Sequence, residues 1–220
     1  MKHPAVPFVL PFALFMAFLV LTGYWSFGET SELLVRIVIL GVAVLYFSRH
    51  LLSFRFTSAG MSTLVGVGVF LLWIAPDQLI PGYRDHWLFQ NPITGTLKVS
   101  LSAETLRDPV ALALRSIRAI VIVPIVEELF WRGWLMRWLI APDFETVRPG
   151  TYDGKAFWLT ALLFASVHGP YWDVGLVCGA IYNGWMVRTK NWNDLILTHA
   201  VTNACLCAFV IATGRWEYWM

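Results

Sequence analysis

Two adjacent glutamates, with an arginine four residues further on, lie inside an otherwise apolar stretch of the chain. They read Glu127-Glu128-Leu-Phe-Trp-Arg132, with Ile-Val-Ile-Val-Pro-Ile-Val before them and Gly-Trp-Leu-Met after them. On a helix, Glu128 and Arg132 share a face and can pair, whereas Glu127 is rotated from Glu128 by about 100°. This spacing predicts a structural ion pair beside a second carboxylate that is free to act as a base. A charge network between helices is the alternative interpretation.

Two further apolar stretches carry isolated polar residues. One reads Phe164-Ala-Ser-Val-His168-Gly-Pro, and the other contains His199-Ala-Val-Thr-Asn203, in which the histidine and the asparagine share a helix face. Taken singly, His168 is typical of a helix cap, and the second pair is typical of a polar contact between membrane helices. Each of three apolar stretches carries such polar residues at one place. Packed helices can bring these places together, so the pattern indicates a common site.

The chemistry of such a site would be the activation of water. A carboxylate and imidazoles around a water molecule can deprotonate it, and an amide or imidazole can donate to a developing oxyanion. The chain has no GxSxG motif for a serine nucleophile. Two histidines and a glutamate also form the zinc ligand set of some hydrolases. HExxH is absent, and each motif supplies one histidine, so the spacing neither supports nor excludes a metal.

The elements that position these residues are predicted to be transmembrane helices. Of the 220 residues, 58% are hydrophobic and 14% are charged, whereas a water-soluble domain carries about 25% charged residues. The chain has 12 tryptophans, which favour membrane interfaces. A net charge of +2, without a basic stripe, gives no reason to expect a nucleic-acid partner. The fold class is therefore an all-α polytopic transmembrane bundle with a polar cavity inside it.

The predicted spans follow the apolar runs of the sequence, which number about eight. They cover residues 6–26, 33–52, 60–80, 109–125, 126–141, 156–170, 174–189 and 194–213. Pro124 interrupts the stretch 109–141, which is therefore either two shorter helices or one kinked helix. Gly175, Gly179 and Asn183 share one face of 174–189, where small residues allow a neighbouring helix to approach closely.

A single membrane domain, residues 1–220, is the expected organisation. Residues 1–108 supply N-terminal spans and a loop, and residues 109–213 form the part that bears the motifs. The first apolar run is expected to be a retained span, because no small-residue cleavage site follows it. Arg49 and Arg55 border the second and third spans, whereas 27–32 has no lysine or arginine, so the N-terminus is expected in the cytoplasm.

The ordered set of three motifs resembles the signature of the CAAX-protease and bacteriocin-processing family. The family pattern is Glu-Glu-x-x-x-Arg, then Phe-x-x-x-His, then His-x-x-x-Asn or Asp. Here it corresponds to Glu127, Glu128 and Arg132, to Phe164 and His168, and to His199 and Asn203. The resemblance covers residues 127–203, and residues 1–108 share only their membrane spans with the family. The chain is also similar to a short bacterial subgroup linked to exosortase-type protein sorting.

The resemblance implies an intramembrane glutamic endopeptidase that acts on a membrane-anchored protein or peptide in a bacterial plasma membrane. It implies that Glu127 and His168 activate the water, that His199 and Asn203 stabilise the oxyanion, and that Glu128 and Arg132 form a supporting pair. It favours a mechanism without a metal or other cofactor. Prenylated substrates do not follow from it, because bacterial members have varied roles.

Two other functions remain open on the sequence. The first is a non-catalytic immunity or scaffold protein that only binds another membrane protein. The second is a proton-coupled transporter, because intramembrane glutamate and histidine also serve as relays. No internal repeat of the kind found in many carriers is present. The sequence does not specify the substrate or the oligomeric state.

Overall fold

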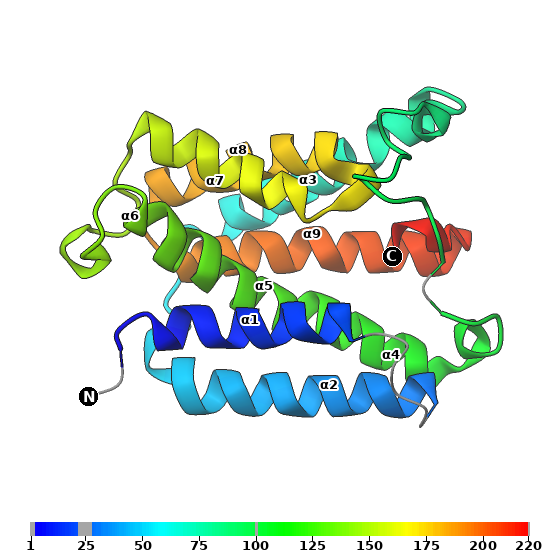
Figure 1. Cartoon of the computed structure of the whole chain (residues 1–220), viewed down its shortest axis with the longest axis horizontal. Coiled ribbons are helices and arrows are strands. Elements are labelled where there is room, and N and C mark those ends of the chain that lie inside the picture. The colour runs from blue at the N-terminus through cyan, green and yellow to red at the C-terminus, as the bar shows by residue number, and fades with distance from the viewer. Residues whose placement is uncertain (1–2, 22–27, 100, 220) are drawn as a thin grey trace.

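The computed structural model describes residues 3–21, 28–99 and 101–219, and this part of the chain folds into helices without any strand longer than an isolated bridge (Figure 1). The predicted all-α class is therefore confirmed. The α-helices are α1 (Val6–Val20), α2 (Glu29–Ala43), α3 (Ala59–Leu79), α4 (Pro109–Ile117), α5 (Val123–Glu128), α6 (Met136–Trp138), α7 (Gly154–Ser166), α8 (Trp172–Thr189) and α9 (Trp192–Thr213).

Four continuous helical segments are long and apolar enough to cross a membrane. They cover Glu29–Leu51, Ala59–Leu79, Pro109–Trp138 and Trp192–Thr213. α1 and α7 are shorter apolar helices of 15 and 13 residues. The last part of the predicted first span, residues 22–26, lies outside the described residues. These apolar helices show an integral membrane protein.

The segment 109–138 is one continuous helix that is widened at two places. π-helical turns cover Arg118–Ile122, between α4 and α5, and Leu129–Leu135, between α5 and α6. Pro124 lacks an N–H donor, and its ring would collide with the carbonyl four residues earlier. A wide turn at that position relieves the collision without ending the helix. Of the two alternatives for 109–141, the structure therefore has the single helix.

The C-terminal helix α9 lies in the middle of the bundle, against α3, α5 and α8 (Figure 1). A Cβ atom on Gly66 of α3 would lie 2.5 Å from the carbonyl oxygen of Thr198 in α9. On α8, a Cβ on Gly179 would lie 3.2 Å from the Ala161 backbone of α7. The small residues predicted to allow close approach thus do so in α8, and Gly66 has the same role in α3.

Gly66 offers a test of this packing. We expect Gly66→Ala to destabilise the protein by about 1–3 kcal/mol, because an added methyl group must push α9 away from α3. Gly68, two residues further on, has no atom within 4 Å of an added Cβ. Gly68→Ala should therefore leave stability unchanged or raise it by up to about 1 kcal/mol. Thermal unfolding of both variants in one detergent checks the difference, and equal midpoints would contradict this account of Gly66.

Candidate active site

A completely buried carboxylate forms the base of the site. Both oxygens of Glu128 accept hydrogen bonds from Nη1 of Arg132, at 3.2 and 3.0 Å. The Nδ1 atom of His199 lies 2.7 Å from Oε1 of the same glutamate, although 71 residues separate the two in the chain. Glu128 and Arg132 are both 0% exposed. One carboxylate therefore joins α5, the wide turn after it and α9.

Arg132 has further partners on α8 and α7. Its Nε donates to Oδ1 of Asn183 at 2.7 Å, and its Nη2 donates to the carbonyl of Gly179 at 3.2 Å. The guanidinium carbon lies 4.7 Å from the centre of the Phe164 ring, which is a cation–π distance. These interactions supply hydrogen-bond acceptors and an aromatic face to a guanidinium group that has no access to water. Arg132 is therefore the point at which three helices are held together.

Glu127 has a different environment from its neighbour, as the helical spacing predicts. Its side chain lines a cavity, and its Oε2 atom is buried without a hydrogen-bond partner among the described residues. A carboxylate in apolar surroundings is costly unless something binds it. Here the side chain with the unsatisfied oxygen lines a space that can hold a ligand or a water molecule.

His168 follows the end of α7 and lines the same cavity. Its Nδ1 atom lies 2.6 Å from the carbonyl oxygen of Phe164. A carbonyl oxygen only accepts, so Nδ1 carries the hydrogen and Nε2 keeps its lone pair. The ring also packs on Phe164, with ring centres 4.5 Å apart, and on Trp73, at 5.4 Å. The backbone and two aromatic rings thus fix the orientation of an imidazole that can accept a proton.

Asn203 lies one helical turn after His199 on α9, and both line the cavity. The amide nitrogen of Asn203 donates to the carbonyl of Ala119 at 2.7 Å. This amide has two N–H groups, so one remains for another acceptor. His199 packs against the ring of Tyr182, with ring centres 5.1 Å apart. Tyr182 in turn donates to Thr202 at 2.8 Å, so α8 helps to orient this face of α9.

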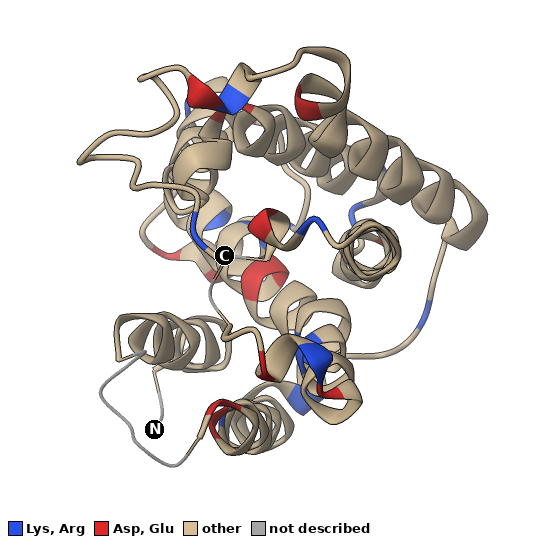
Figure 2. Ribbon diagram, turned by 90° about the vertical axis from the view of Figure 1, so that its right-hand side faces the viewer, with Lys and Arg blue, Asp and Glu red and all other residues tan. Residues whose placement is uncertain are grey.

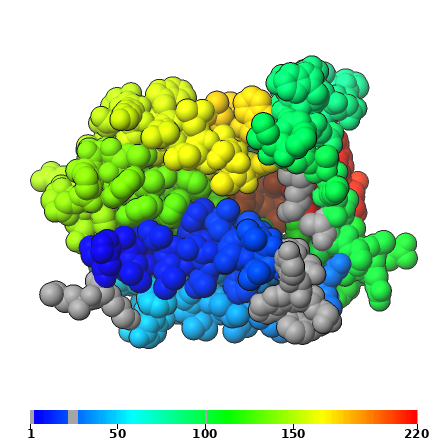
Figure 3. All heavy atoms as spheres, in the orientation of Figure 1, coloured from blue at the N-terminus to red at the C-terminus, as the bar shows by residue number. Residues whose placement is uncertain are grey.

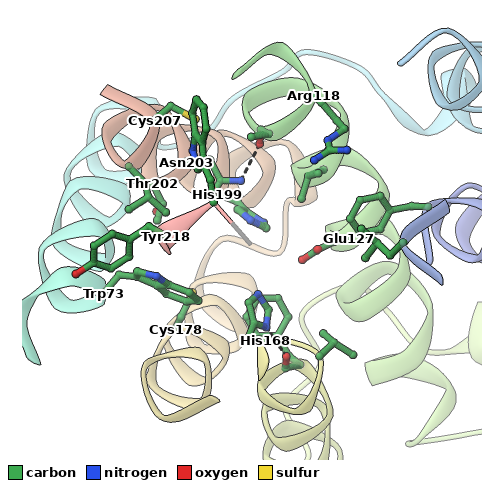
Figure 4. A pocket seen from close by; sticks show the side chains of 18 of the residues that line it. Trp73, Arg118, Glu127, His168, Cys178, His199, Thr202, Asn203, Cys207 and Tyr218 are labelled. Atoms are coloured by element: carbon green, nitrogen blue, oxygen red, sulfur yellow. Dashed lines mark hydrogen bonds between the residues drawn. The ribbon is translucent and has the colours of Figure 1, made fainter. Parts of the chain in front are cut away.

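The cavity has a volume of about 250 Å³. In Figure 4, Glu127, His168 and His199 point from different helices toward one space, and the dashed line marks the bond of Asn203. The structure thus brings Glu127, His168, His199 and Asn203 together around one cavity, and Phe164 also lines it. Glu128 and Arg132 lie behind them and are fully buried. Figure 3 shows a recess between α1 and the residues near the end of α7, with C-terminal residues at its floor.

The cavity also contains residues that the motifs did not select. Arg118 lines it from the wide turn between α4 and α5, and Figure 4 shows its side chain near the same space as Glu127. Phe15 and Met16 of α1 complete the wall next to Glu127. The position of Arg118 inside an apolar run could have indicated from the sequence that it faces the cavity. The apolar wall residues could not be recognised in this way, because they resemble any other lipid-facing or core residue.

The sequence left open whether these side chains bind a zinc ion. Among the residues that the structure describes, no three His, Cys, Asp or Glu side chains are grouped as a metal site requires. His199 directs one ring nitrogen to Glu128, and His168 directs one to a backbone carbonyl. A site that works without a metal stays a prediction.

Comparison with known protein families gives one match. Residues 109–205 match the family described as type II CAAX prenyl endopeptidase Rce1-like. The matched segment begins at the first residue of α4 and ends two residues after Asn203, so it contains all of the motif residues. Searches among curated proteins and among solved structures give no match.

Proposed function

We propose that this membrane protein, whose residues 109–205 match the family described as type II CAAX prenyl endopeptidase Rce1-like, is an endopeptidase in which Glu127 and His168 activate a water molecule. It hydrolyses a peptide bond of a membrane-anchored protein or peptide, without a metal. The observation that supports the proposal most is the side chain of Glu127, which lines the cavity and whose Oε2 atom is buried without a hydrogen-bond partner among the described residues.

The first step is attack by water on the scissile carbonyl. Water in the cavity donates one proton to the Glu127 carboxylate while its oxygen bonds to the carbonyl carbon, so that the carbonyl oxygen becomes negative. Nε2 of His168 accepts the second hydrogen bond of this water and orients it. The free N–H of Asn203 then donates to the oxyanion from the opposite wall.

His199 contributes to the oxyanion in its protonated form. Its Nδ1–H points at Glu128, so only an imidazolium has a second N–H, on Nε2, to donate into the cavity. The Glu128 carboxylate stabilises that cation, as the aspartate does in serine-protease triads. In the last step the carbon–nitrogen bond breaks, and the proton held by Glu127 passes to the departing amine. The products are a carboxylate end and an amino end.

Comparison of membrane-protein termini in cells tests this function. Cells that carry the wild-type protein are compared with cells that carry Glu127→Ala, and the new ends of membrane proteins are identified by mass spectrometry. We expect at least one pair of ends to be present with the wild type and absent with Glu127→Ala. The exposed Glu145 gives the matched control, and Glu145→Ala should keep the wild-type ends. Identical ends in all three strains would contradict the proposal and favour a binding role.

A further inference from the structure

Contacts between loops show which loops lie together at each of the two ends of the bundle. At the first end, which carries the N-terminus in Figure 1, Trp192 donates to the carbonyl of Leu51 at 2.8 Å and Asn191 donates to that of Arg55 at 2.9 Å. The ring of Phe8 packs on that of Phe144 at 5.5 Å. The start of α1 and the segments 49–58, 142–155 and 188–194 therefore lie together, and we call this the basic end.

The second end is formed by other loops. Thr30 donates to Asp108 at 3.0 Å, Trp172 donates to the carbonyl of Leu88 at 3.0 Å, and Tyr218 donates to Asp77 at 2.9 Å. The start of α2, the segments 77–99 and 101–108, the α7–α8 turn and residues 214–219 therefore lie together. We call this the acidic end, and Figure 2 looks onto it.

Charge is distributed unequally between the two ends. The exposed lysines and arginines of the basic end are Arg49, Arg55, Arg148, Lys155, Arg188 and Lys190. At the acidic end, Lys98 and Arg107 are exposed and Arg215 is partly exposed and paired with Glu217, whereas Arg84 is buried and paired with Asp77 and Asp173. The carboxylates of the acidic end are Glu29, Glu32, Asp77, Asp85, Glu104, Asp108, Asp173 and Glu217. Lysine and arginine near the ends of membrane helices are retained on the cytoplasmic side. Arg148, Lys155, Arg188 and Lys190 of the C-terminal half thus lie at the same end of the bundle as Arg49 and Arg55.

The cavity extends toward the acidic end. Beyond Glu127 and His199, its wall includes Trp73, Tyr218 and Trp219. Tyr218 is bonded to Asp77 at the acidic end. The α7–α8 turn, which follows His168, is bonded to the same end through Arg84, which donates to the carbonyl of Pro170 at 2.7 Å. None of the loops of the basic end lines the cavity within the described residues.

We propose that the basic end faces the cytoplasm and that the catalytic cavity is entered from the opposite, non-cytoplasmic side of the membrane. The substrate is then a protein whose apolar anchor is cut near its outer end, and not one presented from the cytoplasm. The statement about the substrate rests on the proposed peptidase function. The statement about orientation and entrance does not.

Cysteine labelling in spheroplasts of a bacterial host tests the orientation. Thr96→Cys marks the acidic end and Thr151→Cys marks the basic end, and both residues are exposed. The parent protein is labelled in parallel and its signal is subtracted, because Cys205 is partly buried and the buried Cys178 and Cys207 line the cavity. A membrane-impermeant maleimide should label Thr96→Cys in intact spheroplasts and Thr151→Cys only after permeabilisation. The reverse pattern, or labelling of both before permeabilisation, would overturn the orientation.

A third variant tests the entrance. Val167 precedes His168, lines the cavity and is 42% exposed. Val167→Cys should be labelled from outside in intact spheroplasts. Labelling only after permeabilisation, or in neither condition, would overturn the proposed entrance. Each pattern should be unchanged in a Glu127→Gln background, because labelling does not depend on cleavage. A correct pattern in a protein that cleaves nothing would leave the orientation standing and reject the peptidase.

Discussion

Purified Glu127→Gln protein is expected to lose about 10²- to 10⁴-fold of its cleavage rate, which is the usual contribution of a positioned general base. Glutamine has nearly the shape of glutamate and can fill the same place in the wall, but its amide does not accept a proton from water at neutral pH. Turnover of a substrate identified in cells, measured under single-turnover conditions, checks the loss.

The control for this substitution must separate chemistry from folding. The thermal midpoint of Glu127→Gln should be equal to or above that of the wild type, because the substitution removes a buried carboxylate whose Oε2 atom has no hydrogen-bond partner among the described residues. Glu145→Gln, on the exposed surface of the basic end, should keep both the rate and the midpoint. A Glu127→Gln protein with the wild-type rate would show that another group is the base.

Arg132→Met is expected to have the largest effect on stability. The substitution leaves the Glu128 carboxylate fully buried with His199 as its only remaining side-chain partner among the described residues, and it removes the bonds to Asn183 and Gly179. Breaking one partner of a buried pair typically costs about 3–5 kcal/mol. We therefore expect little or no monodisperse protein in size-exclusion chromatography, and a strongly lowered thermal midpoint for any that is recovered.

A double variant distinguishes a buried charge from a loss of packing. In Glu128→Gln/Arg132→Met neither charge remains, so part of the lost stability should return. Its cleavage rate should stay low, because a neutral amide in place of the Glu128 carboxylate cannot stabilise a protonated His199. Arg188→Met, which removes an exposed arginine from the end of α8, should change neither property. An Arg132→Met protein as stable as the wild type would exclude a structural role for the pair.

The sequence allowed the residues of the candidate site to be selected because each one breaks an apolar pattern. Glu127, His168 and Asn203 stand out from lipid-compatible neighbours, and the four-residue spacing of Glu128 and Arg132 predicts their shared face. The same rule correctly separated Glu127 from Glu128, because adjacent residues on a helix differ by about 100°.

Other features could not be predicted from the sequence because they depend on contacts between distant segments. No local pattern shows that His199 bonds to Glu128 rather than facing only the cavity, since the two are 71 residues apart. The wide turns around α5 arise from the strain at Pro124 and from packing, so the sequence left the choice between one helix and two open. The end of the bundle at which Arg148 and Lys190 lie could also be assigned only from the folded structure.

The bond between Glu128 and His199 has a consequence for biosynthesis. The glutamates precede His199 and Asn203 in the chain, so until α9 is made Glu128 lacks its bond to His199 and has Arg132 as its side-chain partner among the described residues. If hydrolysis needs the imidazole and the amide of α9, a nascent chain cannot cut its neighbours during insertion. Under the proposed function, activity would begin only when α9 enters the bundle, so that assembly itself would keep the incomplete site inactive.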